Sequence, residues 1–246
     1  MEETLSKNAF KLLCKLNNKK YRDEKTEGFD ILIEGERLIS QVIDYSVKIK
    51  ALYTSENISK FHDLDSRKYY ITEKQAEMLT ETENSQGIFA QVTFQTTQIT
   101  MFNRLVYLNG ISDPGNMGTI IRAAVAFGVD GVIVDDLCCD ISNSKVVRAS
   151  MGAVFKQPIL KVKQGWLSER KETIVISEID NGTPLNEFKF PDSPYILVIG
   201  NEANGVCENI RLQAAHRVYI PMQNSMESLN VAVAAGILMY KLGIRN

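Results

Sequence analysis

The 246-residue chain lacks several features that would place it in a common functional class. It has only two histidines, and its four cysteines show no C-x-x-C spacing, so the ligand sets of zinc sites are missing. It has no run of 18 uninterrupted apolar residues and no apolar core in its N-terminal segment, so neither a membrane helix nor a secretory signal is expected. The sequence therefore predicts a cytoplasmic protein with free thiols, no metal and no membrane contact.

The G-x-G-x-x-G fingerprint of dinucleotide-binding domains is also absent, which disfavours a nucleotide-binding dehydrogenase. The composition, 44% hydrophobic and 24% charged, is that of an ordinary globular protein. A net charge of −2 argues weakly against a nucleic-acid partner. Between Lys7 and Lys25, however, seven basic residues face two acidic ones. This segment predicts contacts with a phosphate backbone, and the alternative is a solvated helix face.

Two α/β segments follow one another along the chain. Residues 1–95 alternate short strands and helices, beginning with an amphipathic helix over 4–18, and predict a small α/β domain. Residues 96–103 are polar and without periodicity, as in a linker. Strands then alternate with helices over 104–246, including helices expected at 165–171 and 206–215. This order predicts a parallel sheet with helices on both faces, and ligands then bind where the strands end.

The first of three unusual loops follows the strand expected at 104–110. Its sequence, DPGNMGTIIRAAVAFG, offers Asp113 as a helix N-cap and Pro114 as the first helical residue. Arg122 falls in the middle of that helix, on a face of small residues. Such an arginine is expected to approach a ligand, a partner or another backbone segment. A local ion pair, the alternative, lacks an acidic residue within four positions.

The second loop, VIGNEANGV, follows an apolar strand. Gly200 and Gly205 have the spacing of a P-loop, but Val206 and Cys207 stand where Lys and Ser or Thr are required. Glu202 would also repel a phosphate. A carboxylate at the end of a buried strand suits a hydroxyl, an amine or a cation, unless it caps the next helix or pairs with an arginine.

The third loop lies between Pro221 and a C-terminal helix that is apolar nearly all round, which predicts a buried helix. Pro221 makes the loop rigid. Ser228 can cap the helix, and Asn230 in its first turn is expected to face the core or a site. The fixed backbone N–H and C=O groups of such a loop suit a flat heteroaromatic ring.

These three loops resemble the three motifs of the SpoU (TrmH-like) family of RNA 2′-O-ribose methyltransferases, within the SPOUT superfamily. DPGNMGTIIRAAVAFGVDGVIV is similar to the first motif, VIGNEANGV to the second and IPMQNSMESLNVAVAAGI to the third. KVVRASMGAVFKQP is similar to the segment between the first two. The motifs cover residues 104–246, and the segment from IEGERLISQV to QGIFAQV is similar to a substrate-binding domain often fused ahead of the catalytic one.

The resemblance implies a fold and a cofactor that the spacing does not show. The C-terminal segment would thread a trefoil knot, a topology too rare to be proposed from a pattern. The cofactor would be S-adenosylmethionine, held by residues Gly200, Ile220, Met222, Leu229 and Asn109. The third loop would then form half of the cofactor pocket, and the small-residue C-terminal helix would be the buried end of the knot and the face of a homodimer.

Carried over position by position, the active-site residues of the family correspond to Arg122, Asn116, Glu202, Ser228 and Asn230. Attack of a ribose 2′-hydroxyl on the sulfonium methyl needs a positioned nucleophile and help with its proton. Arg122 is the candidate activator. Since an arginine pKa exceeds ~12, stabilisation of the developing alkoxide suits it better than the role of base.

The RNA contacts are predicted at residues Lys7, Lys11, Lys15, Lys19, Lys20 and Arg148. The fused N-terminal domain favours ribosomal RNA, by analogy with the family. A tRNA 2′-O-methyltransferase and a catalytically silent RNA-binding module are the alternatives. The intact polar residues in all three motifs disfavour the silent module.

Overall fold

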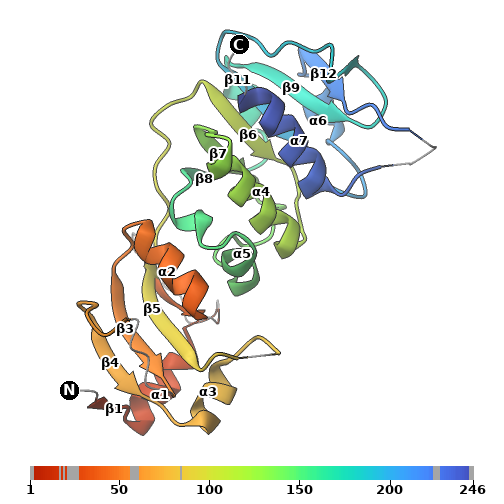
Figure 1. Cartoon of the computed structure of the whole chain (residues 1–246). Coiled ribbons are helices and arrows are strands. Elements are labelled where there is room, and N and C mark those ends of the chain that lie inside the picture. The colour runs from red at the N-terminus through yellow and green to blue at the C-terminus, as the bar shows by residue number, and fades with distance from the viewer. Residues whose placement is uncertain are drawn as a thin grey trace. The chain divides into compact units, whose positions relative to one another are not determined.

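A computed structural model of the chain describes residues 3–16, 18, 20, 28–55, 61–83, 85–223 and 228–243. The predicted RNA contact Lys19 lies outside them. The chain divides into two compact units, Met1–Gln95 and Thr96–Asn246 (Figure 1). Each unit has its own sheet and its own hydrophobic core. No described helix has the length and apolar character needed to cross a membrane.

The described residues of the first unit form a mixed sheet accompanied by three α-helices. Its elements are β1 (Glu3–Thr4), α1 (Lys7–Leu13), β2 (Phe29–Glu34), α2 (Glu36–Asp44), β3 (Ile49–Thr54), β4 (Arg67–Tyr70), α3 (Glu73–Leu79) and β5 (Ile88–Phe94). The strand order is β1-β4-β3-β5-β2. Strand β5 runs antiparallel to β2 and β3, whereas β4 runs parallel to β3 and β1.

The helix expected over residues 4–18 is shorter in the structure. Glu3 and Thr4 pair with β4 and form the edge of the sheet, so the helix starts only after Ser6, whose hydroxyl accepts a hydrogen bond from the Ala9 backbone N–H at 3.2 Å. Pairing with a distant strand satisfies backbone groups and leaves no mark in the local hydrophobic period. Phe10 and Leu13 are buried, as the period predicted.

The second unit contains a seven-stranded sheet. Its elements are β6 (Arg104–Leu108), α4 (Pro114–Ala126), β7 (Gly131–Val134), α5 (Ser144–Ala149), η3 (Ala153–Phe155), β8 (Ile159–Lys161), η4 (Trp166–Glu169), β9 (Thr173–Glu178), β10 (Thr183–Pro184), β11 (Tyr195–Ile199), α6 (Glu208–Arg211), β12 (His216–Tyr219) and α7 (Val231–Gly243). The strand order is β10-β12-β9-β11-β6-β7-β8, and every pair is parallel.

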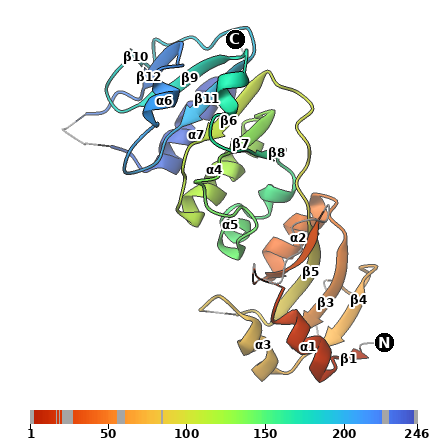
Figure 2. The ribbon, with the colours of Figure 1, turned by 180° about the vertical axis from the view of Figure 1, so that it is seen from behind.

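Helices cover both faces of this sheet, as predicted. On one face, Leu167 of the 3-10 helix η4 and Ile210 of α6 pack on a core that includes Tyr107 and Val198. Helices α4 and α7 pack against each other on the face nearer the viewer in Figure 1, and Figure 2 shows the sheet from behind. The strand ends therefore remain open for the loops that follow them.

Two of the expected helices are only short turns. The segment 165–171 contains the four-residue 3-10 helix η4, and the helix expected over 206–215 is limited to α6. Tertiary contacts hold both ends of α6. The Cys207 N–H donates a hydrogen bond to the Asn109 side chain, and the Ala215 N–H donates to the Ile174 carbonyl of β9.

Residues 96–103, predicted as a linker, lie against the second unit. The Ile159 N–H donates to the Thr97 carbonyl at 3.2 Å. Ile99 occupies the space over Gly131, where an added Cβ would lie 2.5 Å from the Ile99 Cδ1. The segment therefore packs beside β7 and β8 before the chain enters β6.

Candidate active site

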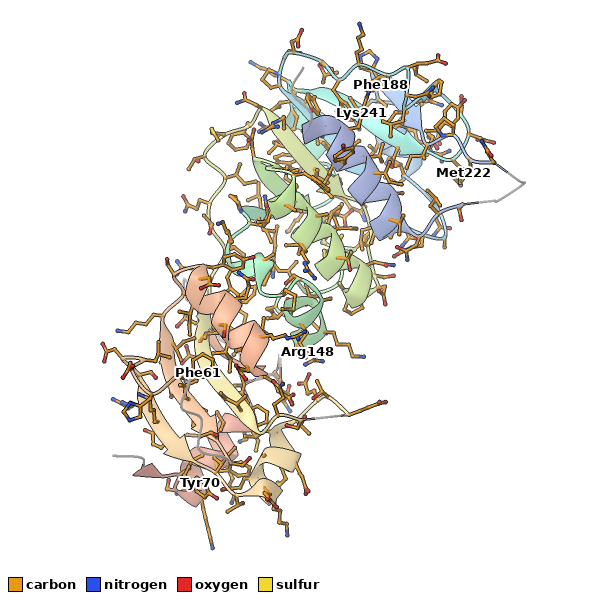
Figure 3. All side chains as sticks on the ribbon, in the orientation of Figure 1. Phe61, Tyr70, Arg148, Phe188, Met222 and Lys241 are labelled. Carbon is orange, nitrogen blue, oxygen red and sulfur yellow. The ribbon has the colours of Figure 1, made fainter. Side chains whose placement is uncertain are left out.

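A cavity of about 400 Å³ lies at the carboxyl ends of β9, β11 and β12. It is lined by the loops that follow these strands and by the start of α7. Four of the five predicted cofactor-binding residues line it: Gly200, Ile220, Met222 and Leu229 (Met222 is labelled in Figure 3). The second and third motifs therefore line the same cavity.

The second-motif loop is a tight turn with little spare room. Asn201 and Gly205 exchange two backbone hydrogen bonds of 2.9 Å, and Gly205 has a φ of +65°. A Cβ on Gly200 would lie 2.3 Å from the Gly205 carbonyl carbon. The Asn201 side chain donates to the Gly110 carbonyl at 2.6 Å, which ties the loop to the end of β6. Asn201 was not among the residues predicted from the sequence.

One polar residue from each motif joins a single hydrogen-bonded chain beside the cavity. The Asn116 amide nitrogen donates to Glu202 Oε1 at 2.8 Å, and the Asn230 amide nitrogen donates to Asn116 Oδ1 at 3.0 Å. Asp113 caps α4, as predicted, and takes the Asn116 backbone N–H at 2.8 Å. Glu202 neither caps α6 nor pairs with an arginine among the described residues. These hydrogen bonds leave the second carboxylate oxygen of Glu202 available to a ligand.

Asn230, rather than Ser228, caps helix α7. Asn230 Oδ1 accepts hydrogen bonds from the backbone N–H groups of Ala232 at 2.9 Å and Val233 at 3.3 Å. The structural role considered for Ser228 is therefore wrong, because the helix begins two residues later than that cap requires. Ser228 is exposed and lines the cavity.

Asn109 lies outside the cavity, in a buried network. Its amide nitrogen donates to Asp135 Oδ2 at 2.7 Å, and its Oδ1 accepts from the Cys207 N–H at 2.9 Å. Asp135 also takes the Gly110 N–H at 3.1 Å. With both ends of its side chain engaged, Asn109 positions the first and second loops and is not among the residues that line the cavity.

Arg122 is not brought to the cavity. It lies six residues after Asn116, and at 3.6 residues per turn the two side chains leave α4 on different sides. Arg122 is exposed and forms no hydrogen bond or ion pair with any described residue. Its neighbour Gly118 allows close packing of α5, since a Cβ there would lie 2.6 Å from the Ala149 Cβ.

Three charged residues that the sequence analysis missed also line the cavity: Glu178, Asp180 and Arg211. Arg211 Nη2 lies 3.1 Å from Glu178 Oε2, and the Glu178 side chain is 9% exposed. Among the described residues, neither Glu178 Oε1 nor Arg211 Nε has a hydrogen-bond partner. Glu178 ends a buried strand, the same signal that identified Glu202. Three carboxylates and one guanidinium suit a ligand that carries positive charge.

Two thiols after β7, those of Cys138 and Cys139, are held in their protonated form. Burial, reinforced by Asp135, raises the pKa of Cys138 to about 12, and burial raises the pKa of Cys139 to about 11. Both thiols therefore stay protonated near neutral pH. Within the described part of the chain, no group of three or more His, Cys, Asp or Glu residues could hold a metal ion.

The two contacts of Asn230 can be separated by substitution. Asn230→Asp keeps an acceptor for the N–H groups of α7 but cannot donate to Asn116, so we expect native stability and reduced turnover. Asn230→Ala loses both contacts and should also cost about 1 kcal/mol of stability. Thermal unfolding measures the first effect, and a single-turnover assay of the activity that the three motifs predict measures the second.

Asn143→Ala is the matched control, because Asn143 caps α5 through the Lys145 N–H at 2.8 Å, away from the cavity. It should lose a similar stability and keep its turnover. Full turnover in Asn230→Asp would show that the hydrogen bond from Asn230 to Asn116 is not needed for activity.

The comparisons with known proteins identify a family for each part of the chain. Residues 103–240 match the SpoU rRNA Methylase family, and residues 7–90 match the MRM3-like substrate binding domain. The chain is 32% identical over 234 residues, 93% of both chains, to the 23S rRNA (guanosine(2553)-2′-O)-methyltransferase RlmP of Bacillus subtilis.

Solved structures match over nearly the full chain. The AdoMet-bound rRNA methyltransferase from Sinorhizobium meliloti superimposes with a TM-score of 0.80 at 26% identity, covering 97% of this chain and 95% of that one. The methyltransferase AviRb from Streptomyces viridochromogenes, at 24% identity and a TM-score of 0.81 over 97% of both chains, shares the fold. The chain belongs to the SpoU rRNA methylase family, as its three motifs predicted.

Proposed function

We propose that this protein transfers the methyl group of S-adenosylmethionine to a ribose 2′-hydroxyl of ribosomal RNA. Its family makes it an RNA methyltransferase. The relative from B. subtilis that matches 93% of the chain is named as a 23S rRNA 2′-O-methyltransferase. The observation that carries the proposal is the hydrogen-bonded chain of Glu202, Asn116 and Asn230, one residue from each motif, beside the cavity. The protein would act in the cytoplasm on rRNA.

The cavity fits the cofactor in size and in charge. At about 400 Å³ it falls in the ordinary range of small-molecule sites. Its apolar wall, made of Ile199, Val218, Ile220, Leu229 and Leu238, suits the adenine ring. The carboxylates of Glu178 and Asp180 suit a sulfonium cation. When bound, the cofactor supplies an electrophilic methyl group, and the likeness to an AdoMet-bound rRNA methyltransferase supports its identity.

The polar chain would orient the ribose. The second carboxylate oxygen of Glu202 would accept a hydrogen bond from the 2′-hydroxyl. This bond would hold the hydroxyl oxygen in the direction of the methyl group. Asn230, held by the start of α7, fixes which way the Asn116 amide faces, and Asn116 in turn fixes Glu202. Exposed Ser228 contacts the same ribose. Such positioning reduces the barrier without a strong base.

Arg122 would act from outside the cavity. It is exposed and without a described partner, so its guanidinium can bind the phosphate next to the reacting ribose and stabilise the developing 2′-alkoxide. The exposed Lys7, Lys11, Lys15 and Lys20, together with Arg148 on α5, would contact other phosphates of the RNA.

The trefoil knot is part of the proposal. Helix α7 packs beside α4, which follows β6, whereas the strand that precedes α7 is β12 near the far edge of the sheet. The chain therefore crosses the ends of β9 and β11, where residues of 220–238 line the same cavity as the second-motif loop. A trefoil knot requires such a crossing, because the C-terminal segment must pass beneath the second-motif loop.

Helix α7 also supports a homodimer. The sequence, apolar nearly all round, predicts a buried helix, but Val233, Ile237 and Tyr240 are 52%, 37% and 58% exposed. They follow one another at helical spacing and form an apolar stripe that one chain leaves in water. A second copy would cover it.

The apolar stripe on α7 predicts that one introduced charge disrupts the dimer. Ile237→Arg should convert a dimer at micromolar concentration into a monomer, without loss of folding, because residue 237 is exposed in one chain. Sedimentation velocity measures the change. Leu212→Arg is the control, since Leu212 is 75% exposed on another surface. A wild-type protein that sediments as a monomer would refute the dimer.

The proposed function is tested by mapping 2′-O-methyl marks across total RNA from cells with and without the gene. We expect one rRNA mark to disappear and to return when purified protein and S-adenosylmethionine are added. Loss of a tRNA mark would support the tRNA alternative. Unchanged marks, with a melting temperature that S-adenosylhomocysteine does not shift, would support the silent RNA-binding module.

A further inference from the structure

A second cavity, of about 510 Å³, lies within the N-terminal unit, between α1 and the sheet. Helix α1 and its flanks contribute an apolar wall that includes Leu12, which is 66% exposed. The strands β3, β4 and β5 and the residue before β3 contribute the opposite side, with Lys48, Lys50, Tyr53, Arg67, Tyr69 and Gln91. We refer to this cavity as the α1 cleft.

The charged residues that line the α1 cleft, among those the structure describes, are all positive. They are Lys48, Lys50 and Arg67, and no described carboxylate lines the cleft. Lys50 lies 2.6 Å from Asp30, whereas Lys48 and Arg67 form no ion pair with any described residue. On a chain of net charge −2, a cleft with unpaired cations is suited to an anion.

The aromatic side chains of the cleft are stacked and fixed in place. The rings of Tyr53 and Tyr69 lie 5.4 Å apart at an interplanar angle of 14°. The Tyr53 hydroxyl donates to Gln91 Oε1 at 2.8 Å, and the Gln91 amide donates to Asp30 at 2.7 Å. Tyr53 is buried and Tyr69 half-buried, so Tyr69 is the ring that a ligand can reach.

We propose that the α1 cleft binds an unpaired nucleotide of the RNA substrate, with its base stacked on Tyr69 and its phosphate held by Arg67 and Lys48. Proteins read single-stranded RNA by stacking bases on aromatic rings beside cationic side chains, which is the combination found here. The apolar wall of α1 would cover the other side of the base. The inference rests on the proposed function, because it assigns part of the same RNA to this unit.

Strand β4 supplies its own controls. Side chains alternate between the two faces of a strand, so Arg67 and Tyr69 face the cleft while Lys68 and Tyr70 face away from it. Lys68 donates to the Leu64 carbonyl at 2.8 Å, and Tyr70 is 47% exposed outside the cleft (labelled in Figure 3). Each variant in the cleft therefore has a neighbour of the same chemistry on the other face.

The test uses the full chain and rRNA purified from cells that lack the gene. We expect Tyr69→Ala to weaken RNA binding about tenfold or more, and Tyr69→Phe to bind as the wild type does. Arg67→Gln should lower the slope of log affinity against log salt by about one. Tyr70→Ala and Lys68→Gln should leave affinity and slope unchanged, and all variants should bind S-adenosylhomocysteine normally.

Ultraviolet cross-linking tests the cleft on the wild-type protein, so the result does not depend on whether a variant folds. We expect a nucleotide attached to the peptide that contains residues 67–70. The inference about the cleft would be overturned if Tyr69→Ala bound RNA as tightly as the wild type, or if Tyr70→Ala lost as much RNA affinity as Tyr69→Ala. If the wild-type protein still methylated rRNA, the proposed function would stand. A wild-type protein that neither binds nor methylates rRNA would overturn both.

Discussion

Arg122→Ala is expected to slow single-turnover methyl transfer by about 10²–10³, the usual loss when one donor to a developing oxyanion is removed. Arg122 is exposed on α4 and forms no hydrogen bond or ion pair with a described residue. Its removal therefore leaves no cavity and no unpaired partner, and stability should change by less than about 0.5 kcal/mol. Cofactor affinity should stay unchanged, since Arg122 does not line the cofactor cavity.

Arg122→Lys should not restore the rate, because an ammonium lacks the planar fork that spans phosphate and ribose oxygens. Melting temperature and cofactor affinity, measured on both variants, serve as controls for folding. Near-normal turnover in a folded Arg122→Ala would remove this residue from the mechanism. Glu202 would then be the acceptor of the 2′-hydroxyl proton, and Glu202→Gln would be the variant that loses turnover.

Gly200→Ala is expected to abolish measurable cofactor binding. The added Cβ would lie 2.3 Å from the Gly205 carbonyl carbon, 2.4 Å from the Val206 nitrogen and 2.6 Å from the Gly205 oxygen. All three are backbone atoms, so no side-chain rotation can relieve the overlap. Relief requires opening the two hydrogen bonds between Asn201 and Gly205, which shape the cavity wall. Overpacking of this kind also costs about 1–3 kcal/mol of stability.

Gly236→Ala provides the matched control. Beyond the backbone of its own helix, a Cβ at Gly236 would meet no described atom within 4 Å, and alanine favours a helix over glycine by about 1 kcal/mol. The same chemical change should therefore stabilise the chain at one glycine and destabilise it at the other. Thermal unfolding and calorimetric binding of S-adenosylhomocysteine measure both effects. Wild-type affinity in Gly200→Ala would show that the loop can move without loss of the site.

The order of most strands and helices, the capping of α4 by Asp113 and the position of Glu202 at a strand end could be predicted from the sequence, whereas the short strands β1 and β10 were not. Each depends on residues close together in the chain, such as the apolar runs of β6 and β11 or the Asp-Pro pair before α4. Motif order and spacing then predicted the family, because three ordered motifs are specific.

Only the tertiary structure decided which of these residues work together. Asn116 bonds to Glu202 across 86 positions and to Asn230 across 114, and no local pattern records such a pairing. The same holds for Asn109, whose side chain is held by Asp135 and Cys207 outside the cavity.

The Glu178–Arg211 pair and the α1 cleft were likewise absent from the sequence analysis. Local sequence determines which backbone conformation and which face of an element are favourable. Hydrogen bonds and cavities arise where elements distant in the chain meet, and those distances are set by the packing of the sheets as a whole.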